Sequence, residues 1–530
     1  MNIIVADNLP ASAVDLLRAV DGWSVDTFAG RPRSELLTAM ATADALLVRS
    51  ATKVDRELLE ASPALRIVAR AGTGVDNVDL QVASARGIMV TNAPGVNSVS
   101  VAEHVFALML SLARRVPVAD GSMKQHRWEK KALVGAEIRG KTLGVVGLGR
   151  IGQEVAHRAR VFGMSVVAYD PFIPPHVAAD MGVRLLALDE VCSQADFITL
   201  HVPVTDETRG LFGREQLARC KAGVCLINTA RGELVDEAAL LELLESGHLG
   251  GAGLDVYEKE PPTDWQLVSH PRVVATPHIA ASTSEAQELV GLDVAEGVRD
   301  YLLHGVVRNA VNFPSVPAEE FAKLRPWMSL AERLGVCAAQ LATGPIQKVG
   351  IRYYGQLAEG PRELITGSVL VGIFQHILSA GTVTLVNARS LAADRGVEVL
   401  DTRSTRVRDF TSLISVKVHT SAGEQWLEGA IFEHGGPRIV LLNGVGVEAP
   451  IEGALIVIEN QDRPGVIGEV GACLGRHAIN IATFALGRTD AGAVGIVKVD
   501  ERDAAKVDDA VLAEIRAIGA VRRATVVRLT

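Results

Sequence analysis

The sequence predicts an α/β protein with two doubly wound parallel-sheet units, followed by an α+β unit and a small βαββαβ unit. Short apolar runs alternate with helix-like segments from residue 1 and again from residue 142, which is the rhythm of βαβ units. Apolar residues make up 48% and aromatic residues only 4%, a balance typical of Ala- and Val-rich sheets buried under helices. A chain of 530 residues also exceeds what one core fills, so we expect three or four domains.

The order of these elements divides the chain into four units. A long apolar helix is expected over Ser98–Val116, capped by Ser98 or Ser100, and it leads into the second βαβ series. NAVNFPSVP at 309–317 is typical of a linker, and the unit after it has an amphipathic helix predicted over Glu363–Ser379. From residue 453 the pattern strand, helix, strand, strand, helix, strand predicts the βαββαβ arrangement. The predicted units, first to fourth, are 1–97 with 284–308, 98–283, 318–450 and 453–530.

Charge and cysteine content exclude several classes of function. A net charge of −9 provides no general basic field for nucleic acid or an anionic membrane surface. The five cysteines have no metal-binding spacing, which favours reduced thiols without disulfides or a metal site. The start MNIIVADNLP is unlike an export signal, and the most apolar stretch, 367–386, is interrupted by polar residues. We therefore expect a cytoplasmic protein.

The segment after the strand Thr142–Val146 predicts a dinucleotide site. GLGRIG places Gly147, Gly149 and Gly152 between that strand and a helix, where glycines permit the turn and the approach of a pyrophosphate to the helix N-terminus. Asp170 ends the next strand, where a carboxylate accepts hydrogen bonds from the ribose hydroxyls of NAD and repels the extra phosphate of NADP. The alternative is a glycine-rich turn and a solvated aspartate.

Three further stretches follow strands of the same series and carry acid–base side chains. Arg231 lies in LINTARGELVD, Glu260 in GLDVYEKEPP and His278 in ATPHIAAST. Transfer of a hydride from a hydroxyl carbon needs a base, and a histidine paired with a carboxylate supplies one near neutral pH. An arginine binds a substrate carboxylate through two parallel hydrogen bonds. Taken singly, each residue is equally well explained as a surface charge or a satisfied histidine.

Cations also follow strands of the first unit. Arg49, Lys53 and Arg70 lie in loops there, and Gly72 and Gly74 let backbone N–H groups face an anion. Such a cluster suits a substrate with two negative groups. The alternative is that the arginines are ordinary strand-end charges and the glycines only make a turn.

These motifs together resemble those of the D-2-hydroxyacid dehydrogenase family, in chain order and over almost all of residues 1 to 310. The resemblance implies an NAD-dependent dehydrogenase in which Arg231, Glu260 and His278 form the catalytic trio. RSATKV, RAGTGVDNVD and SMKQHRWEKK are most similar to the long-chain branch that oxidises 3-phosphoglycerate to 3-phosphohydroxypyruvate, the first step of serine biosynthesis. The implied substrate contacts are Arg49, Ser50, Arg70, Gly74 and Asn97. The implied cofactor contacts are Thr73, Gly147, Gly149, Arg150, Ile151, Gly152, Asp170, Thr229, Ala230 and Asp255.

The fourth unit, with DRPG at its first strand-to-helix turn and HAINIATF at its second strand, resembles an ACT domain. That likeness implies paired domains that bind an amino acid, with Asn460, Asp462 and Asn480 as contacts and serine as the feedback inhibitor. Asp462 is equally well explained as a cap of the helix that begins near Pro464. The third unit resembles the intervening domain of long-chain relatives.

The charged segment around Trp128 favours a subunit contact, and the family places this region in a dimer. Lys130 or Lys131 would then reach the neighbouring subunit's site, and we expect a dimer or tetramer. A tryptophan packed within its own subunit is the alternative.

Two other functions remain open on the sequence. One is a dehydrogenase for another 2-hydroxy acid, of the glyoxylate or hydroxypyruvate reductase type. The other is a non-catalytic, NAD-sensing protein like the dehydrogenase-related corepressors.

Overall fold

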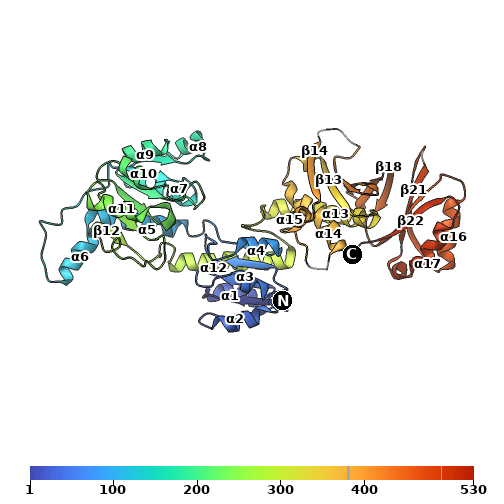
Figure 1. Cartoon of the computed structure of the whole chain (residues 1–530), viewed down its shortest axis with the longest axis horizontal. Helices are drawn as coiled ribbons and strands as arrows, with labels where there is room; N and C mark the ends of the chain where they lie inside the picture. Colours follow the sequence, from blue (N-terminus) through green and yellow to red (C-terminus); the bar gives the residue numbers. More distant parts are fainter. Residues whose placement is uncertain (315, 379–381, 405, 407–408, 491, 530) are drawn as a thin grey trace.

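The computed structural model describes residues 1–314, 316–378, 382–404, 406, 409–490 and 492–529. The chain is elongated, with the second unit at one end, the first unit beside it, and the third and fourth units in a row toward the other end (Figure 1). Four separate sheets form the framework. They confirm the predicted fold class of two parallel-sheet units, an α+β unit and a βαββαβ unit.

The first unit is a five-stranded parallel sheet in the order β2-β1-β3-β4-β5. Helix α12 (Ser284–His304) returns to it from the second unit, and its Val290 and Val294 share a core with Ile3 and Leu17. The remaining elements are β1 (Asn2–Val5), α1 (Ala11–Arg18), β2 (Ser24–Thr27), α2 (Arg33–Met40), β3 (Ala45–Val48), α3 (Arg56–Glu60), β4 (Ile67–Arg70), α4 (Leu80–Ala85) and β5 (Met89–Thr91).

The second unit is a seven-stranded parallel sheet in the order β12-β11-β10-β9-β6-β7-β8. The strands are parallel, and the order in which they are added to the sheet reverses between β6 and β9, so a ligand crevice is expected at the carboxyl ends of these strands. Its elements are α5 (Ser98–Arg114), α6 (Val116–Lys124), β6 (Thr142–Val146), α7 (Arg150–Val161), β7 (Ser165–Tyr169), α8 (Pro175–Asp180), β8 (Arg184–Leu185), α9 (Leu188–Gln194), β9 (Phe197–Leu200), α10 (Arg214–Arg219), β10 (Cys225–Asn228), η1 (Gly232–Leu234), α11 (Glu237–Glu245), β11 (Gly251–Leu254) and β12 (Val273–Ala275).

The long helix expected over Ser98–Val116 is two helices, and its predicted caps are wrong. Arg115 adopts a left-handed backbone conformation with φ of 53°, which ends α5 and starts α6 in a new direction. The cap residue is Asn97, which makes no side-chain cap. Ser98 is buried in the helix, and Ser100 Oγ pairs with Thr283 Oγ1 at 2.9 Å.

The third unit is a six-stranded mixed sheet in the order β14-β13-β15-β16-β17-β18, packed against helices α13 and α14. Helix α14 ends at Ile377, and Ser379, its predicted end, lies outside the described residues. The elements are α13 (Ala318–Leu341), β13 (Ile346–Gly355), η2 (Gln356–Ala358), α14 (Arg362–Ile377), α15 (Ala388–Asp394), β14 (Glu398–Ser404), β15 (Ser412–Thr420), β16 (Gly423–Phe432), β17 (Gly436–Leu442) and β18 (Val445–Pro450).

The fourth unit is an antiparallel sheet in the order β20-β21-β19-β22, the arrangement of a βαββαβ fold. Alternate residues of β19 serve two cores: Leu455 and Val457 pack toward the third unit, whereas Ile456 and Ile458 pack under α16 and α17. The two helices therefore lie on the outer face (Figure 1). The elements are β19 (Ala454–Asn460), α16 (Val466–Arg476), β20 (Ile481–Thr489), β21 (Gly492–Val499), η3 (Glu501–Lys506), α17 (Asp509–Arg516) and β22 (Val521–Arg528).

A short loop of the third unit contacts the first unit. Thr384 Oγ1 donates to the Gly87 carbonyl oxygen at 2.9 Å, just after α4. Among the residues that the structure describes, every helix is too short or too polar to cross a lipid bilayer.

Candidate active site

A histidine–glutamate pair lies at the carboxyl ends of the second unit's strands. His278 Nδ1 is 2.6 Å from Glu260 Oε2, and this hydrogen bond raises the pKa of His278 above its usual value. Burial pushes the pKa of Glu260 upward, but the hydrogen bond to His278, the charge of His278 and the hydrogen bond from the Tyr257 amide together lower that pKa overall. With Nδ1 held by the glutamate, His278 Nε2 is the nitrogen left to exchange a proton with a substrate.

Asp255 holds the turn that carries His278. The His278 backbone is left-handed, with φ of 55°, an uncommon conformation for a non-glycine residue. Asp255 is fully buried and accepts hydrogen bonds from the amides of Ile279 and Ala280, both at 2.8 Å, and from Thr276 Oγ1 at 2.6 Å. These donors account for both carboxylate oxygens. Asp255 was predicted as a cofactor contact, and in the structure its visible role is to position His278.

A histidine that the sequence did not single out supports the same turn. His104, on α5, places Nε2 2.9 Å from Thr276 Oγ1 and 3.5 Å from Asp255 Oδ1. Burial raises the pKa of Asp255, but His104, Thr276 and the two backbone amides lower it overall, so the carboxylate stays charged. His104 was missed because it lies inside an apolar helix, far from every strand end.

Arg231 approaches the His278–Glu260 pair from a turn after β10, and its charge acts on His278. We call the region around these three residues, where the first and second units meet, the cleft. Asn228, which is buried, shapes this turn by donating from Nδ2 to the Arg231 carbonyl oxygen at 2.7 Å and accepting from the Ala230 amide at 3.0 Å. A Cβ on Gly232 would lie 1.9 Å from the Tyr257 carbonyl carbon, so only glycine lets this turn pack against the loop that leads to Glu260. Arg231 Nη2 extends to Asp76 of the first unit at 3.0 Å.

Arg231 meets two further arginines of the first unit. Burial lowers the pKa of the Arg70 guanidinium, and the positive charges of Arg231 and Arg49 lower it further. Arg70 Nε is buried without a hydrogen-bond partner in the described chain. Arg70 therefore lies near two further cations and has an unsatisfied donor, while the carboxylates of Asp76 and Asp7 offset part of the positive charge. This arrangement is suited to an anion of more than one charge.

Loops of the first unit hold these arginines in place. The Asp7 carboxylate accepts from the Arg49 amide at 2.6 Å and from Thr52 Oγ1 at 2.6 Å. Asn77 Nδ2 donates to the carbonyl oxygens of Arg49 and Thr52. Ser50, a predicted substrate contact, is exposed in this loop. Sequence reasoning did not single out Asp7 and Asn77 for this site; Asp7 lies two residues after β1, which was an available signal, whereas Asn77 lies seven residues beyond β4.

The remaining predicted contacts of the first unit gather beside Arg231. Thr73 Oγ1 and Asn97 Oδ1 are 3.0 Å apart, and Asn97 is buried at the start of α5. A Cβ on Gly74 would lie 2.1 Å from Arg231 Nη2, so glycine leaves that guanidinium its space. These residues line the boundary between the first two units.

The glycine-rich turn has the local geometry of a dinucleotide cradle. Gly147 has φ of 94°, and a Cβ there would lie 2.6 Å from the His201 carbonyl oxygen. A Cβ on Gly152 would lie 2.1 Å from the Gly147 carbonyl oxygen, so helix α7 approaches the strand closely. Gly149, in contrast, faces open space at the start of α7. This combination leaves room for a pyrophosphate at a helix N-terminus, so the residues fit NAD.

The other predicted cofactor residues surround this cradle. Asp170 ends β7, where its carboxylate accepts from the amides of Leu148 and Phe172 at 2.8 and 2.9 Å. Thr229 Oγ1 is buried without a partner in the described chain, next to Ala230. Arg150 extends to the Pro94 carbonyl oxygen of the first unit, and Ile151 packs against the second unit's core.

The fourth unit has a small pocket at the DRPG turn. Its lining includes Asn460, Asp462, Pro464, Phe484 and Arg488. Asp462 does not cap α16, because Gly465 occupies the cap position and Asp462 Oδ1 instead lies 3.4 Å from Arg488 Nε. The cap interpretation is therefore wrong.

Asn480 does not reach this pocket within one chain. It follows the far end of α16, about 16 Å along the helix at 1.5 Å per residue. The backbone amide of Asn480 donates a hydrogen bond to the Asp503 carboxylate.

The segment around Trp128 is exposed in the single chain. Trp128 is 79% exposed and Val134 78%, and neighbouring α6 stands away from the body of the second unit (Figure 1). The alternative of a tryptophan packed within its own subunit is wrong for this chain.

Models of three families match successive parts of the chain. Residues 106–280 match the D-isomer specific 2-hydroxyacid dehydrogenase, NAD binding domain. Residues 323–443 match the D-3-phosphoglycerate dehydrogenase intervening domain, and residues 454–520 match the ACT domain.

Curated relatives match along the whole chain. A protein of Archaeoglobus fulgidus is 43% identical over 92% of each chain, and one of Methanocaldococcus jannaschii is 41% identical over 100% of each. A protein of Mycobacterium tuberculosis is 43% identical over 94% of each chain. All three are named D-3-phosphoglycerate dehydrogenase.

Two solved structures each match about three fifths of this chain. A glyoxylate reductase from Paecilomyes thermophila is 30% identical, with a TM-score of 0.54 over 59% of this chain and 98% of its own. D-lactate dehydrogenase from Aquifex aeolicus, complexed with NAD and lactic acid, is 30% identical, with a TM-score of 0.51 over 59% of this chain and 100% of its own.

Proposed function

Because the chain belongs to the D-3-phosphoglycerate dehydrogenase family of D-isomer specific 2-hydroxyacid dehydrogenases, we propose that it oxidises 3-phospho-D-glycerate to 3-phosphohydroxypyruvate, the first step of serine biosynthesis. The protein is an NAD-dependent oxidoreductase. We assign substrate binding to the first unit, NAD binding to the second, and regulation to the fourth.

One observation carries the substrate assignment. Burial lowers the pKa of Arg70, Arg231 and Arg49 lie close enough that their charges lower it further, and Arg70 Nε has no partner in the described chain. A plain hydroxy acid supplies one carboxylate, whereas phosphoglycerate supplies a carboxylate and a phosphate. The second anion relieves the repulsion among the cations and gives Arg70 its missing acceptor.

The residues divide the chemistry as follows. NAD, when bound, accepts the hydride of the hydroxyl carbon. His278 Nε2 takes the hydroxyl proton, while the bond from Nδ1 to Glu260 keeps the ring in one orientation and stabilises its charged form. Arg231 binds the substrate carboxylate. In the reverse direction it stabilises the negative charge that develops on the carbonyl oxygen as the carbonyl is reduced. Asp255 keeps the His278 turn in its left-handed conformation.

The test compares substrates with and without the phosphate. Initial rates of NADH formation are measured with 3-phosphoglycerate, D-glycerate and D-lactate, each with NAD. We expect kcat/KM to be highest for 3-phosphoglycerate. Equal values for the three substrates would contradict the assignment and favour a dehydrogenase for another 2-hydroxy acid; no turnover of any, with NAD still bound, would favour a non-catalytic sensor.

We further propose that serine inhibits the enzyme through the pocket of the fourth unit. The Asp462 carboxylate suits an ammonium group and Arg488 suits a carboxylate, so their pairing across the pocket is what an amino acid would replace. Buried Asn460 is beside them, and Asn480 would come from a second chain. Serine added to the rate assay should suppress turnover in the native chain and less so in Asp462→Asn. Unchanged turnover in the native chain would contradict this regulation.

A homo-oligomer, a dimer or tetramer, is proposed from the exposed side chains near α6. Trp128 and Val134 are apolar and exposed to nearly four fifths, which is costly unless another chain covers them. Lys130 or Lys131 would then lie near the neighbouring site. The five cysteines form no disulfide in the described part of the chain, which supports our proposal of a place in the cytoplasm. Sedimentation of the native chain and of Trp128→Ser tests the contact.

A further inference from the structure

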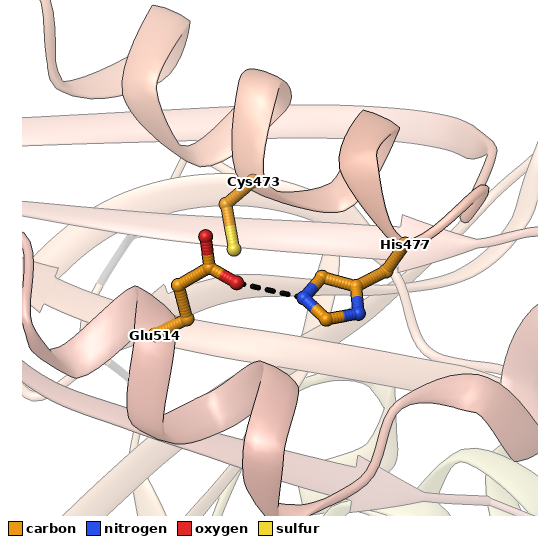
Figure 2. A group of neighbouring side chains, drawn as sticks. All are labelled: Cys473, His477 and Glu514. Carbon is orange, nitrogen blue, oxygen red and sulfur yellow. Dashed lines mark hydrogen bonds and ion pairs between the residues drawn. The ribbon is translucent and has the colours of Figure 1, made fainter.

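A cysteine, a histidine and a glutamate meet on the outer face of the fourth unit (Figure 2). Cys473 and His477 come from α16, four residues apart, and Glu514 comes from α17. Their ligand atoms all lie within 4.8 Å of one another. Among the described residues, no other group of three such side chains approaches as closely.

We propose that Cys473, His477 and Glu514 bind a divalent cation of the zinc type. The proposal is independent of the dehydrogenase assignment, since the site lies in the regulatory unit and shares no residue with the cleft. A thiolate, an imidazole and a carboxylate are the ligands that Zn²⁺ combines in tetrahedral sites, with water in the fourth position. A hard cation such as Mg²⁺ would not select a buried sulfur.

The geometry needs little change to accept the ion. At zinc bond lengths of 2.0 to 2.3 Å, tetrahedral ligand atoms are about 3.3 to 3.8 Å apart, so a pair at the 4.8 Å limit must close by about 1 Å and the His477–Glu514 pair must open by about 0.6 Å. His477 Nε2 and Glu514 Oε2 are already 2.7 Å apart, and the ion would replace the proton between them. Side-chain rotation is available, because His477 and Glu514 are 36% and 38% exposed.

Cys473 contributes the selectivity of the site. Its side chain is buried, 1% exposed, yet it faces the other two groups (Figure 2). Metal ligation requires the thiolate, so the Cys473 thiol would release its proton when the ion binds.

Arg476 is the built-in competitor for this site. It forms an ion pair with Glu514, on the oxygen that His477 does not use. Arg476 and His477 together lower the pKa of Glu514 to about 2, so the carboxylate is charged and available at neutral pH. A bound dication would compete with Arg476 for it.

The site would tie α16 to α17. Helix α16 begins beside the DRPG pocket and carries two of the three ligands at its other end. An ion would therefore hold the helix whose first turn lines the pocket.

Sequence spacing conceals this site. His477 and Glu514 are separated by 37 residues, and the single cysteine has no second cysteine beside it. Only the packing of α16 on α17 brings the three together.

The test uses cobalt as a spectroscopic substitute for zinc in the full chain. The reduced, chelator-treated protein is titrated with Co²⁺, and we expect one ion per chain with a thiolate-to-cobalt charge-transfer band that Zn²⁺ removes. Cys473→Ala should abolish the band. Cys337→Ala is the matched control, since Cys337 is also a helix cysteine that is 1% exposed, and it should keep the band.

Because Cys473 is buried, variants of the exposed ligands separate a lost ligand from a lost fold. His477→Gln and Glu514→Gln should each weaken Zn²⁺ binding about tenfold or more, measured by competition with a chelating dye. Arg476→Gln should strengthen it several-fold, which a purely structural role for these residues does not predict. Absence of the band in the native chain, its survival in Cys473→Ala, its loss in Cys337→Ala, or an Arg476→Gln variant that binds more weakly would overturn the proposal.

Discussion

Two histidine–glutamate pairs in this chain have nearly the same geometry and different surroundings. His278 lies 2.6 Å from Glu260 in the cleft, and His477 lies 2.7 Å from Glu514 on the fourth unit. In the cleft, Arg231 is close enough to influence the histidine, and Asp255 fixes its backbone. On the fourth unit, Arg476 shares the glutamate and a thiol completes the group.

The difference shows that the pair itself does not decide the chemistry. Beside Arg231, whose charge acts on the histidine, the pair is suited to moving a proton to or from a negatively charged substrate. Beside a buried thiol, the same two side chains are suited to holding a cation. The four predictions below test this contrast, from the largest expected effect to the smallest.

Replacing the two histidines in turn gives the largest contrast. His278→Ala should lower kcat by about 10² to 10⁴ because the general base is lost, while NAD affinity stays the same. His477→Ala should change kcat less than twofold, about 0.4 kcal/mol at most. Steady-state rates and NAD titration measure both. A comparable loss of kcat in the two variants would remove the distinction between the pairs.

The cations of the cleft are the second test. Arg70→Gln should lower kcat/KM for 3-phosphoglycerate about 10- to 100-fold, because a buried charge-assisted contact to an anion is lost. Arg66→Gln is the control. Arg66 directly precedes strand β4, which ends at Arg70, but its guanidinium lies over the Tyr301 ring, so its loss should leave kcat/KM nearly unchanged. Equal losses would mean that the effect is one of net charge alone.

The pH dependence of the rate tests the cleft pair. Glu260 raises the pKa of His278, and oxidation needs the neutral ring, so the oxidation rate rises as pH increases through that pKa. Glu260→Gln should move this rise to lower pH and reduce kcat about tenfold at its plateau, because the imidazolium is less stabilised. The reverse reaction needs the protonated ring, so its alkaline decline should shift in the same direction. An unmoved profile would exclude His278 as the titrating group.

The smallest effect, on local stability, is expected at the His477–Glu514 pair. The pKa of Glu514 is lowered to about 2, so its ion pairs stabilise the folded fourth unit above the usual glutamate pKa of 4.5, and this contribution is lost as pH falls toward 2. Glu514→Gln should speed hydrogen exchange in α16 and α17 severalfold at most at pH 7. The ratio to the native rate should approach one in acid, and a ratio independent of pH would contradict the assignment.

Local patterns were enough to predict the two parallel sheets and the C-terminal fold. Gly147, Gly149 and Gly152 lie within six residues, so the turn is signalled by a short motif, although the close approach of His201 to Gly147 is a tertiary contact. The helix break at Arg115 was missed although Pro117, two residues later, is a signal of a helix boundary; the left-handed backbone of Arg115 itself has no signal of its own in the sequence. The alternative that Asp462 caps α16 was wrong because the helix begins at Val466 with Gly465 at the cap position, and Arg488, on another strand, pairs with Asp462.

The sequence by itself determined the fold class, the family and the types of side chain available to the cleft. These depend on periodicity and on short motifs, whose physical causes are local. Only the tertiary structure decided that Arg70 and Arg231 lie near each other, that His104 and Asp255 support His278, and that Cys473 meets Glu514. Each of these contacts joins elements far apart in the chain, and packing alone brings such residues together.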